Sequence, residues 1–338
     1  MSGPRIFFER DAAGLSNVRL QLESLLVLAA LTGRALVLPP PSRIQHLAEP
    51  FHESQFWSMI HLCRHATVIL QSQPDGAAGA DSLRRSLADV SFSAQGEPSP
   101  DSGLGRGDWF FPMQLSRIQH FECLRLATAE QRRLAAAVVK ESFELDGRFR
   151  ASARRALQHL GLAPSSYVAV HIRRGDFAQF RPQTQTSGHS LAVTSQGLCR
   201  AGGLPLVVAT DAGPEDPVFR QFAAACSVPA LLTADAHEEH VDDVTRAAVD
   251  LLLCAWAKSF VGTPDSTFST TIMGLRTKAG LDDKAVDAEP RFLLGGKPDL
   301  AQSSGMCWSK PTTFAALRPG AADAREESPS GPAVGWLL

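Results

Sequence analysis

The residues best suited to chemistry follow a short apolar run that ends at Ile172. Four polar residues cluster at its carboxyl end: His171, Arg173, Arg174 and Asp176. Such a run before a glycine turn is typical of a buried strand in an α/β sheet, and these sheets bind ligands beyond the carboxyl ends of their strands. Because arginine stays charged and its planar fork matches phosphate oxygens, the motif predicts a phosphate site. A buried arginine–carboxylate network that holds two elements together is an equally good interpretation of this stretch alone.

The composition is that of an ordinary globular protein. The chain has 338 residues, 44% of them hydrophobic, and a formal net charge of -2. This is enough chain for two domains of typical size, and the near-neutral charge gives no electrostatic reason to expect a nucleic acid as partner. The 6 cysteines form no CxxC pair, which argues against a cysteine-rich metal site. Their wide spacing fits either buried thiols or a few long-range disulfides.

The first apolar stretch, residues 20–38, contains Glu23 and Arg34 and is too polar to span a bilayer. We recognise no signal peptide and expect no membrane insertion by this chain. The compartment is left open: the protein is cytosolic, or a targeting segment is missing from the chain.

The order of apolar runs and turns predicts an α/β protein. Strands are expected at 5–11, 35–41, 167–172, 204–211, 229–232 and 258–263, and helices at 18–32, 128–160, 216–225 and 241–257. Alternation of strands and helices in both halves predicts two doubly wound, Rossmann-like domains that face a cleft. Neither GxGxxG nor GxxxxGK[ST] occurs, so a nucleotide would bind without those glycine loops.

Domain boundaries follow from shifts in composition. We predict an N-terminal domain over residues 1–160 and a C-terminal domain over residues 161–318. Residues 72–108 are rich in Ser, Gly, Pro, Asp and Gln and are expected to form an exposed, disordered insertion. The Gly-, Ala-, Ser- and Pro-rich residues 319–338 are expected to form a disordered tail.

Four separated segments occur in an order typical of one enzyme family. They are GLSNVRLQLESLLVLAALTGRALVLPP, VHIRRGD, VVATD and VDLLLCAWAKSFVGTPDSTFS. Together they resemble the GDP-fucose-dependent fucosyltransferases with an HxRR-type motif, which include protein O-fucosyltransferases, α1,6-fucosyltransferases and bacterial nodulation fucosyltransferases. The resemblance covers residues 5–45 and 165–275 and carries little weight between them. It implies a GT-B fold and inverting transfer of fucose from GDP-fucose to a hydroxyl of a protein Ser/Thr or of a glycan, with no metal or other cofactor.

The resemblance also implies roles for the residues of the HxRR segment. His171 would help to fix the guanine. Arg173 would contact the β-phosphate and support the departure of GDP, and is therefore the expected catalytic residue. Arg174 would be its phosphate-binding partner, and Asp176 would buttress the arginines or contact the donor.

Further donor-binding roles follow from the other segments. Asp211 ends VVATD and would lie beside the nucleotide at the next strand end. Asp250 precedes Ser266 by the separation at which the α1,6 enzymes place their guanine-binding acid. Asn17 matches the asparagine of the N-terminal G-x-x-N turn. Four residues match the element that presents hydroxyls and backbone N–H groups to the phosphates: Ser266, Thr267, Phe268 and Ser269.

Simpler roles compete for several of these residues. Asp250 also suits a helix cap or a salt bridge, Asp211 an N-cap, and Asn17 the cap of a helix that starts at Val18. The HEEH stretch at 237–240 lacks the spacing of a zinc protease and is expected to be a solvated loop.

The chain departs from the family at one place. Members that act on thrombospondin-type repeats carry a glutamate, proposed as the base, where this chain has Gly14. The alternative to an enzyme is therefore a non-catalytic nucleotide-sugar-binding or interaction protein that keeps the GDP pocket. The charges favour an enzyme, because fixed arginines aimed at a departing diphosphate stabilise the transition state more than the ground state.

Overall fold

A computed structural model describes residues 3–71, 107–111, 128–175, 187–238, 240–263 and 266–278. These residues fall into two compact units, the first ending at Gly147 and the second beginning at Arg148. The predicted boundary at 160/161 would have left the helix after Arg148 in the first domain. Most of the predicted insertion at 72–108, the tail at 319–338 and Asp176 lie outside the described residues.

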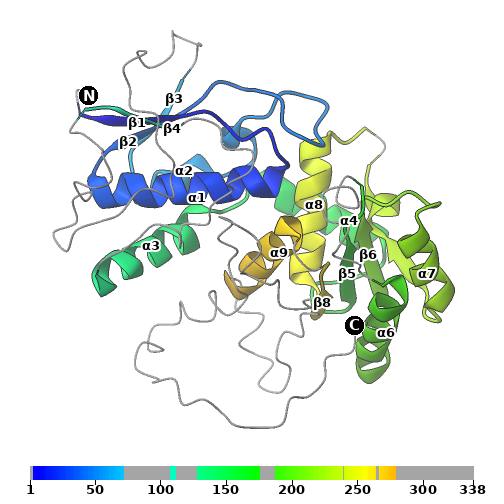
Figure 1. The fold of residues 1–338 in the computed structure, drawn as a ribbon. Helices are drawn as coiled ribbons and strands as arrows, with labels where there is room; N and C mark the ends of the chain where they lie inside the picture. The colour runs from blue at the N-terminus through cyan, green and yellow to red at the C-terminus, as the bar shows by residue number, and fades with distance from the viewer. Residues whose placement is uncertain are drawn as a thin grey trace, which may run out of the picture. The chain divides into compact units, whose positions relative to one another are not determined.

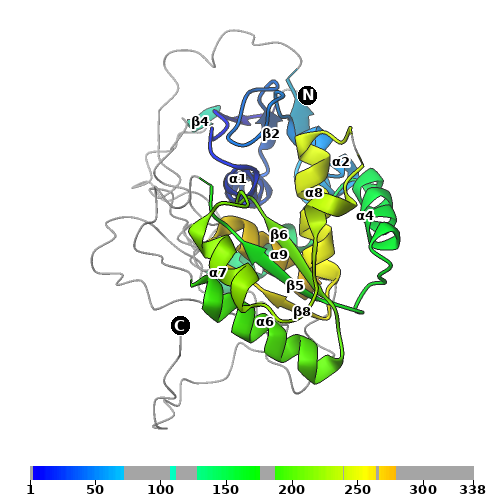
Figure 2. The same ribbon diagram turned by 90° about the vertical axis from the view of Figure 1, so that its right-hand side faces the viewer.

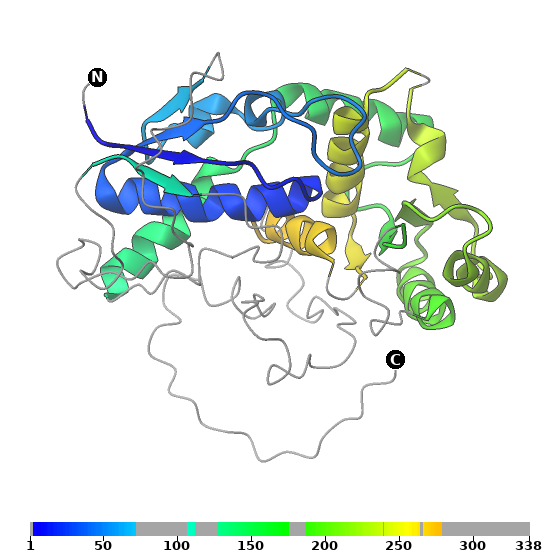
Figure 3. The same cartoon turned by 45° about the horizontal axis from the view of Figure 1, so that its top comes forward.

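The first unit is built around a parallel sheet. Its described strands lie in the order β3-β2-β1-β4, with β1 at Arg5–Phe8, β2 at Ala35–Leu38, β3 at Val68–Leu70 and β4 at Trp109–Phe111. Helix α1 (Leu15–Thr32) connects β1 to β2 and runs along one face of this sheet (Figure 3). It ends where Gly33 adopts a left-handed conformation with φ 64°, which glycine tolerates without steric cost.

Smaller elements complete the first unit. They are η1 (Glu53–Gln55), α2 (Met59–Leu62) and α3 (Ala129–Ser142), of which α3 packs against α1. Helix α3 begins with a capping box, in which the Thr128 side chain accepts from the Gln131 N–H and the Gln131 side chain accepts from the Thr128 N–H.

The predicted single helix at 128–160 is wrong. The structure has α3 and a separate helix α4 (Gly147–His159), with a break between them. The reason is a long-range backbone pairing: the Ser58 N–H donates to the Glu144 carbonyl, and the Asp146 N–H donates to the Phe56 carbonyl. This pairing leaves Phe143 and Leu145 buried. Tertiary contacts with a segment far away in sequence therefore override the local helical pattern.

The second unit repeats the plan of the first. Its described strands are all parallel in the order β7-β6-β5-β8, with β5 at Val168–Ile172, β6 at Leu206–Thr210, β7 at Ala230–Leu232 and β8 at Ser259–Val261. Every residue of β5 is buried, as expected for a central strand covered on both faces.

Helices cover both faces of the second sheet. Helices α6 (Gly188–Gly202) and α7 (Pro217–Ala225) lie on one face, and α8 (Asp243–Trp256) and α9 (Thr267–Lys278) lie on the other (Figure 1 and Figure 2). A short helix, η5 (Thr233–Ala236), follows β7. The chain runs from β5 to β6 on one side and returns to β8 on the other. The strand order therefore reverses between β5 and β8, which is the position where doubly wound sheets bind their ligands.

Two side chains fix α8 and α9 against this sheet. The buried Tyr167 hydroxyl donates to the Leu253 carbonyl of α8. The buried Arg276 guanidinium of α9 donates to the carbonyls that end α8 and follow it, those of Cys254, Ala255, Ala257 and Lys258. The carbonyls left open at the end of α8 are thus satisfied by a neighbouring helix.

Two further predictions concern the cysteines and membrane insertion. Within them, Cys63, Cys199, Cys226 and Cys254 are free thiols, and Cys123 and Cys307 lie outside. In the same part of the chain, no helix combines the length and apolar character needed to cross a membrane.

Candidate functional site

The carboxyl ends of β5 and β8 are joined by Thr263. Its hydroxyl donates to the His171 carbonyl over 2.8 Å and accepts from the Arg173 N–H over 2.9 Å. Thr263 is buried, so these two bonds fix the backbone where the HxRR segment leaves its strand. Sequence analysis missed Thr263. The only local sign of its role is its position just after strand β8, in the segment GTPDSTFS.

Asp211, at the end of β6, holds the turn that contains both arginines. Its carboxylate pairs with the Arg173 guanidinium and accepts from the Arg174 N–H over 2.6 Å. Gly175 lies in the same turn with φ +26°, and a Cβ added there would lie 2.6 Å from Asp211 Oδ2. Glycine is therefore required at this position, both by conformation and by the close approach of the carboxylate.

Arg174 is held by a different carboxylate, that of Asp216. Its Nε lies 3.1 Å from each Asp216 oxygen. Asp216 is also the N-cap of α7, since its Oδ1 accepts from the Val218 and Phe219 N–H groups over 2.8 and 3.1 Å. The prediction that Asp211 caps this helix is therefore wrong. Sequence analysis used Asp216 only as the start of a helix.

His171 is buried at this site as a neutral imidazole. Only 5% of the residue is exposed, its Nδ1 lies 2.8 Å from the Ser269 hydroxyl, and its ring centroid lies 4.9 Å from that of Phe268. Burial lowers the pKa of His171 to about 3, with a further contribution from the charge of Arg173. At physiological pH the ring therefore offers one donor and one acceptor rather than a positive charge.

The segment after β8 brings its hydroxyls to the same place. Ser266 and Ser269 are buried, and the Ser266 hydroxyl accepts from the Ser269 N–H over 3.4 Å. Thr267 and Phe268 begin α9. Gly262 permits this packing, because a Cβ there would lie 2.9 Å from the Ser269 Cβ. The structure thus brings together His171, Phe268 and Ser269, with Ser266 in the adjoining turn.

Asp250 is in hydrogen-bond contact with His237. The His237 Nε2 lies 3.0 Å from Asp250 Oδ1, and the side chains are 7% and 18% exposed. Asp250 lies in the middle of α8, whose N-cap is Asp242, so the prediction of a capping role is wrong and that of a salt-bridge partner is confirmed. The prediction of a solvated HEEH loop is wrong for His237, which is buried against this carboxylate.

Asn17 belongs to the first unit, whereas the residues above belong to the second. Helix α1 begins at Leu15 with Gly14 as its N-cap, so the prediction that Asn17 caps a helix starting at Val18 is wrong. Its backbone N–H donates to the Gly14 carbonyl over 2.8 Å. Its buried Oδ1 has no hydrogen-bond partner within the described part of the chain.

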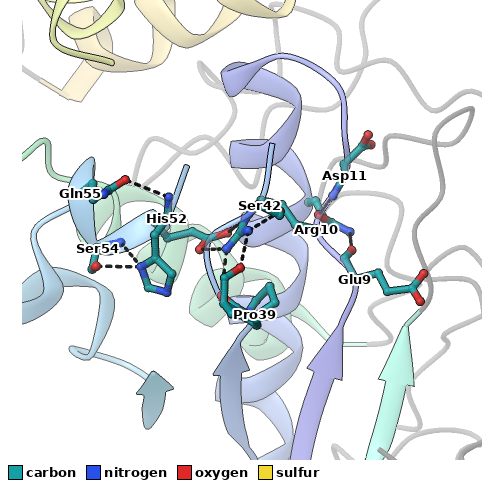
Figure 4. Close-up of polar contacts among 11 residues, drawn as sticks. Glu9, Arg10, Asp11, Pro39, Ser42, His52, Ser54 and Gln55 are labelled. Atoms are coloured by element: carbon teal, nitrogen blue, oxygen red, sulfur yellow. Dashed lines mark hydrogen bonds and ion pairs between the residues drawn. The ribbon is translucent and has the colours of Figure 1, made fainter. Parts of the chain in front are cut away.

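A second polar network lies at the carboxyl ends of β1 and β2 (Figure 4). The buried Arg10 pairs with both oxygens of the buried Glu53 over 2.7 and 2.6 Å, and also donates to the Pro39 and Pro40 carbonyls and to the Ser42 hydroxyl. With all its donors used, Arg10 serves to fix these loops. No sequence signal identified this pair, because the partners are far apart in the chain.

Two carboxylates flank the Arg10 network without joining it. Glu9 and Asp11 point away from Arg10 (Figure 4). Burial raises the pKa of the Asp11 carboxyl, and the hydrogen bond from the Ala13 N–H partly offsets this effect. Gly14, where some relatives carry the proposed base, lies under the ring of His46: a Cβ there would lie 3.3 Å from His46 Cδ2.

Among the described residues, no group of three or more His, Cys, Asp or Glu side chains is arranged to hold a metal ion.

Comparison with known proteins gives a relative in sequence and neighbours in fold. No family model matches the chain. Over 112 residues the chain is 33% identical to GDP-fucose protein O-fucosyltransferase 2 of Drosophila melanogaster, a match that covers 31% of this chain and only 22% of that protein. The crystal structure of POFUT1 in complex with GDP superposes with a TM-score of 0.51 at 13% identity and covers 88% of this chain and 99% of that one. POFUT1 in complex with GDP-fucose gives 0.50 at 14% identity, with coverage of 87% and 99%.

These similarities define a class of protein. The chain has the α/β, GT-B type of fold seen in POFUT1, with two parallel sheets, which confirms the predicted fold class. The resemblance to the GDP-fucose-dependent fucosyltransferase superfamily is also confirmed, by the relative in sequence, which is a GDP-fucose protein O-fucosyltransferase.

Proposed function

We propose that this protein transfers fucose from GDP-fucose to a hydroxyl of a protein Ser/Thr or of a glycan, with inversion at the anomeric carbon. The observation that carries this proposal is the pair of arginines at the carboxyl end of β5, beside the point where the strand order reverses. The unit that holds them has the architecture of a nucleotide-binding domain.

The guanine would be recognised by His171 and Asp250. A carboxylate can accept hydrogen bonds from guanine N1–H and N2–H, and adenine lacks that pair of donors. His237 supports such a role because its ring holds Asp250 Oδ1 at 3.0 Å and so limits the rotation of the carboxylate. A neutral His171 suits the task as well, since a charged ring would repel the donor groups of guanine.

The diphosphate would be bound by Arg173 and Arg174, with the first turn of α9 contributing the N–H groups of Thr267 and Phe268, and that of Ser269 once it leaves the Ser266 hydroxyl. The first turn of a helix leaves backbone donors without partners inside the helix, and its dipole favours an anion. Ser266 would add its hydroxyl. Asp176 and Asn17 are proposed as further donor contacts on the strength of the resemblance.

Asp211 would act as the counter-charge that the donor displaces. Its single negative charge now holds Arg173. A diphosphate brings more than one negative charge and several acceptor oxygens, so it can compete for this guanidinium. Asp211 would meanwhile keep the Arg174 backbone in place and hold the turn ready for the ligand.

The chemical step would depend on Arg173. As the bond between the fucose anomeric carbon and the β-phosphate oxygen breaks, its electron pair stays on that oxygen and the charge of the diphosphate rises. An acceptor hydroxyl attacks the carbon from the opposite face and releases its proton to solvent water. A fixed guanidinium beside the departing oxygen stabilises the transition state more than the ground state. We propose that Arg173 and Arg174 supply this positive charge without a metal ion.

The test is to incubate the protein with GDP-fucose and a panel of acceptors, including folded Cys-rich modules and glycans. GDP release coupled to a fucosylated product supports the proposal, and the anomeric configuration of that product, read by NMR, tests inversion. Binding of GDP without any turnover would instead favour a non-catalytic nucleotide-sugar-binding protein.

A further inference from the structure

Arg174 is anchored through only one edge of its guanidinium. The Nε lies 3.1 Å from both oxygens of Asp216, and the side chain is 17% exposed. Within the described part of the chain, neither of its Nη nitrogens has a hydrogen-bond partner. The guanidinium is thus fixed along its Nε edge, while the two terminal nitrogens, which can bind an oxyanion in parallel, are not used.

Asp216 is itself fixed by the fold. Its Oδ1 accepts from two N–H groups at the start of α7, and Pro217 occupies the first position of that helix. Helix α7 packs tightly on α6: a Cβ at Gly188 would lie 2.0 Å from the Val218 carbonyl oxygen. The carboxylate therefore cannot easily turn away from Arg174.

The two carboxylate oxygens of Asp216 have different sets of hydrogen-bond partners. Oδ1 serves the helix and Arg174, whereas Oδ2 contacts Arg174 alone among the described residues. The hydrogen bonds from Phe219 and Arg174 outweigh the effect of burial and lower the pKa of Asp216, so its carboxylate stays ionised at neutral pH.

We propose that Asp216 is a positioning residue for the donor diphosphate: it holds Arg174 by Nε so that Nη1 and Nη2 are presented together to phosphate oxygens. This inference rests on the proposed function. The inference adds to that function a residue, Asp216, that contacts the arginine and not the ligand.

Two effects of Asp216 on an anion have opposite signs. Its negative charge repels the phosphates, so charge alone predicts that its removal strengthens binding. Its hydrogen bonds to Arg174 already restrict the rotamers of that side chain, so the ligand does not have to order it. Positioning therefore predicts that removal of Asp216 weakens binding of the anion. Immobilising such a side chain costs up to about 1.5 kcal/mol, which corresponds to about a tenfold change in affinity. The sign of the change therefore separates the two effects.

The test compares Asp216→Asn with the wild type. Asparagine caps helices as well as aspartate does, and its Oδ1 can keep both bonds to α7. Its amide nitrogen would replace Oδ2, which removes one of the two acceptors of the Arg174 Nε–H and the negative charge that holds the guanidinium. The matched control is Asp242→Asn at the N-cap of α8, where the carboxylate accepts from Thr245 and contacts no arginine. Asp216→Ser is a second variant, which can cap the helix but is too short to reach Arg174.

Calorimetric titrations with GDP and with guanosine provide the measurement, alongside Arg174→Ala and the double variant Arg174→Ala/Asp216→Asn. We expect Asp216→Asn to weaken GDP binding by about tenfold and to leave the affinity for guanosine unchanged. In the Arg174→Ala background, the same substitution should cause no further loss of GDP affinity. Asp242→Asn should bind GDP like the wild type.

Three outcomes would overturn the inference. If the wild type binds GDP and Asp216→Asn binds it equally or more tightly, Asp216 does not position Arg174. An equal loss with or without Arg174 would show that Asp216 acts by another route. A wild type that does not bind GDP at all would instead overturn the proposed function, and the inference with it.

Discussion

Burial of His171 as a neutral imidazole should make the folded state sensitive to acid. The pKa of His171 is lowered to about 3 by burial and by Arg173, whereas an unfolded histidine titrates near 6.5. The unfolded chain therefore binds the proton more readily than the folded chain. The contribution of His171 to stability is fully present above about pH 6.5 and is lost as the pH falls toward about 3. The slope is about 1.4 kcal/mol per pH unit, or about 2.7 kcal/mol between about pH 6.5 and 4.5.

The assay is urea unfolding of the wild type and of His171→Asn at several pH values. Asparagine can keep a hydrogen bond to Ser269 but cannot take up the proton. We expect the difference in unfolding free energy between the two proteins to change by about 1.4 kcal/mol per pH unit below about pH 6.5. His189→Asn, which removes an exposed imidazole of the same unit, is the control. Parallel curves for the wild type and His171→Asn would refute the assignment of a buried, neutral His171.

Three further predictions concern ligands and the arginine turn. Asp250→Ala should weaken the binding of GDP far more than that of ADP or UDP, because a site built for the polar edge of guanine leaves its own groups unpaired with another base. Equal affinity of the wild type for ADP and GDP in titrations would contradict this prediction. Gly175→Ala should weaken GDP and lower the unfolding midpoint, since its Cβ would meet Asp211 at 2.6 Å, and an unchanged affinity would show that this turn does not shape the site. Fucosyl transfer should survive EDTA, since Arg173 and Arg174 are proposed to supply the counter-charge; complete loss, restored by one divalent ion, would assign that task to a metal.

The sequence predicted the strands of the second unit well because their signals are local, whereas helices α6 and α9 were not predicted. The strands around Val170 and Val208 read as short apolar runs, and each ends where a polar segment begins. The order of these strands and helices was enough to predict a parallel, doubly wound sheet. The helix predicted at 128–160 failed because its break depends on backbone pairing with Phe56 and Ser58, which no local pattern reveals.

The candidate site likewise contains residues that the sequence identified and residues that it did not. His171, Arg173 and Arg174 stand out because their residue types do chemistry and they follow a strand directly. Thr263 and Asp216 went unnoticed because their importance lies in which backbone or side-chain atoms they contact.

Partners distant in sequence were the hardest to predict. His237 was read as part of a loop, since its partner Asp250 lies on the following helix. Arg10 and Glu53 are 43 residues apart and meet only when the loops after β1 and β2 fold together. Sequence therefore pointed to the groups that we propose as ligand contacts, and the structure adds the groups that hold them in place.

The most direct test of the proposed function is the rate of GDP formation from GDP-fucose by the wild type and by Arg173→Ala, with urea unfolding to show that both are folded. We predict turnover by the wild type and a loss on the order of 10²–10³ in rate for Arg173→Ala. Arg173→Lys should recover little of it, because lysine lacks the planar fork. A folded Arg173→Ala protein with near wild-type turnover, or a wild type that binds GDP and never releases it from GDP-fucose, would contradict the proposal.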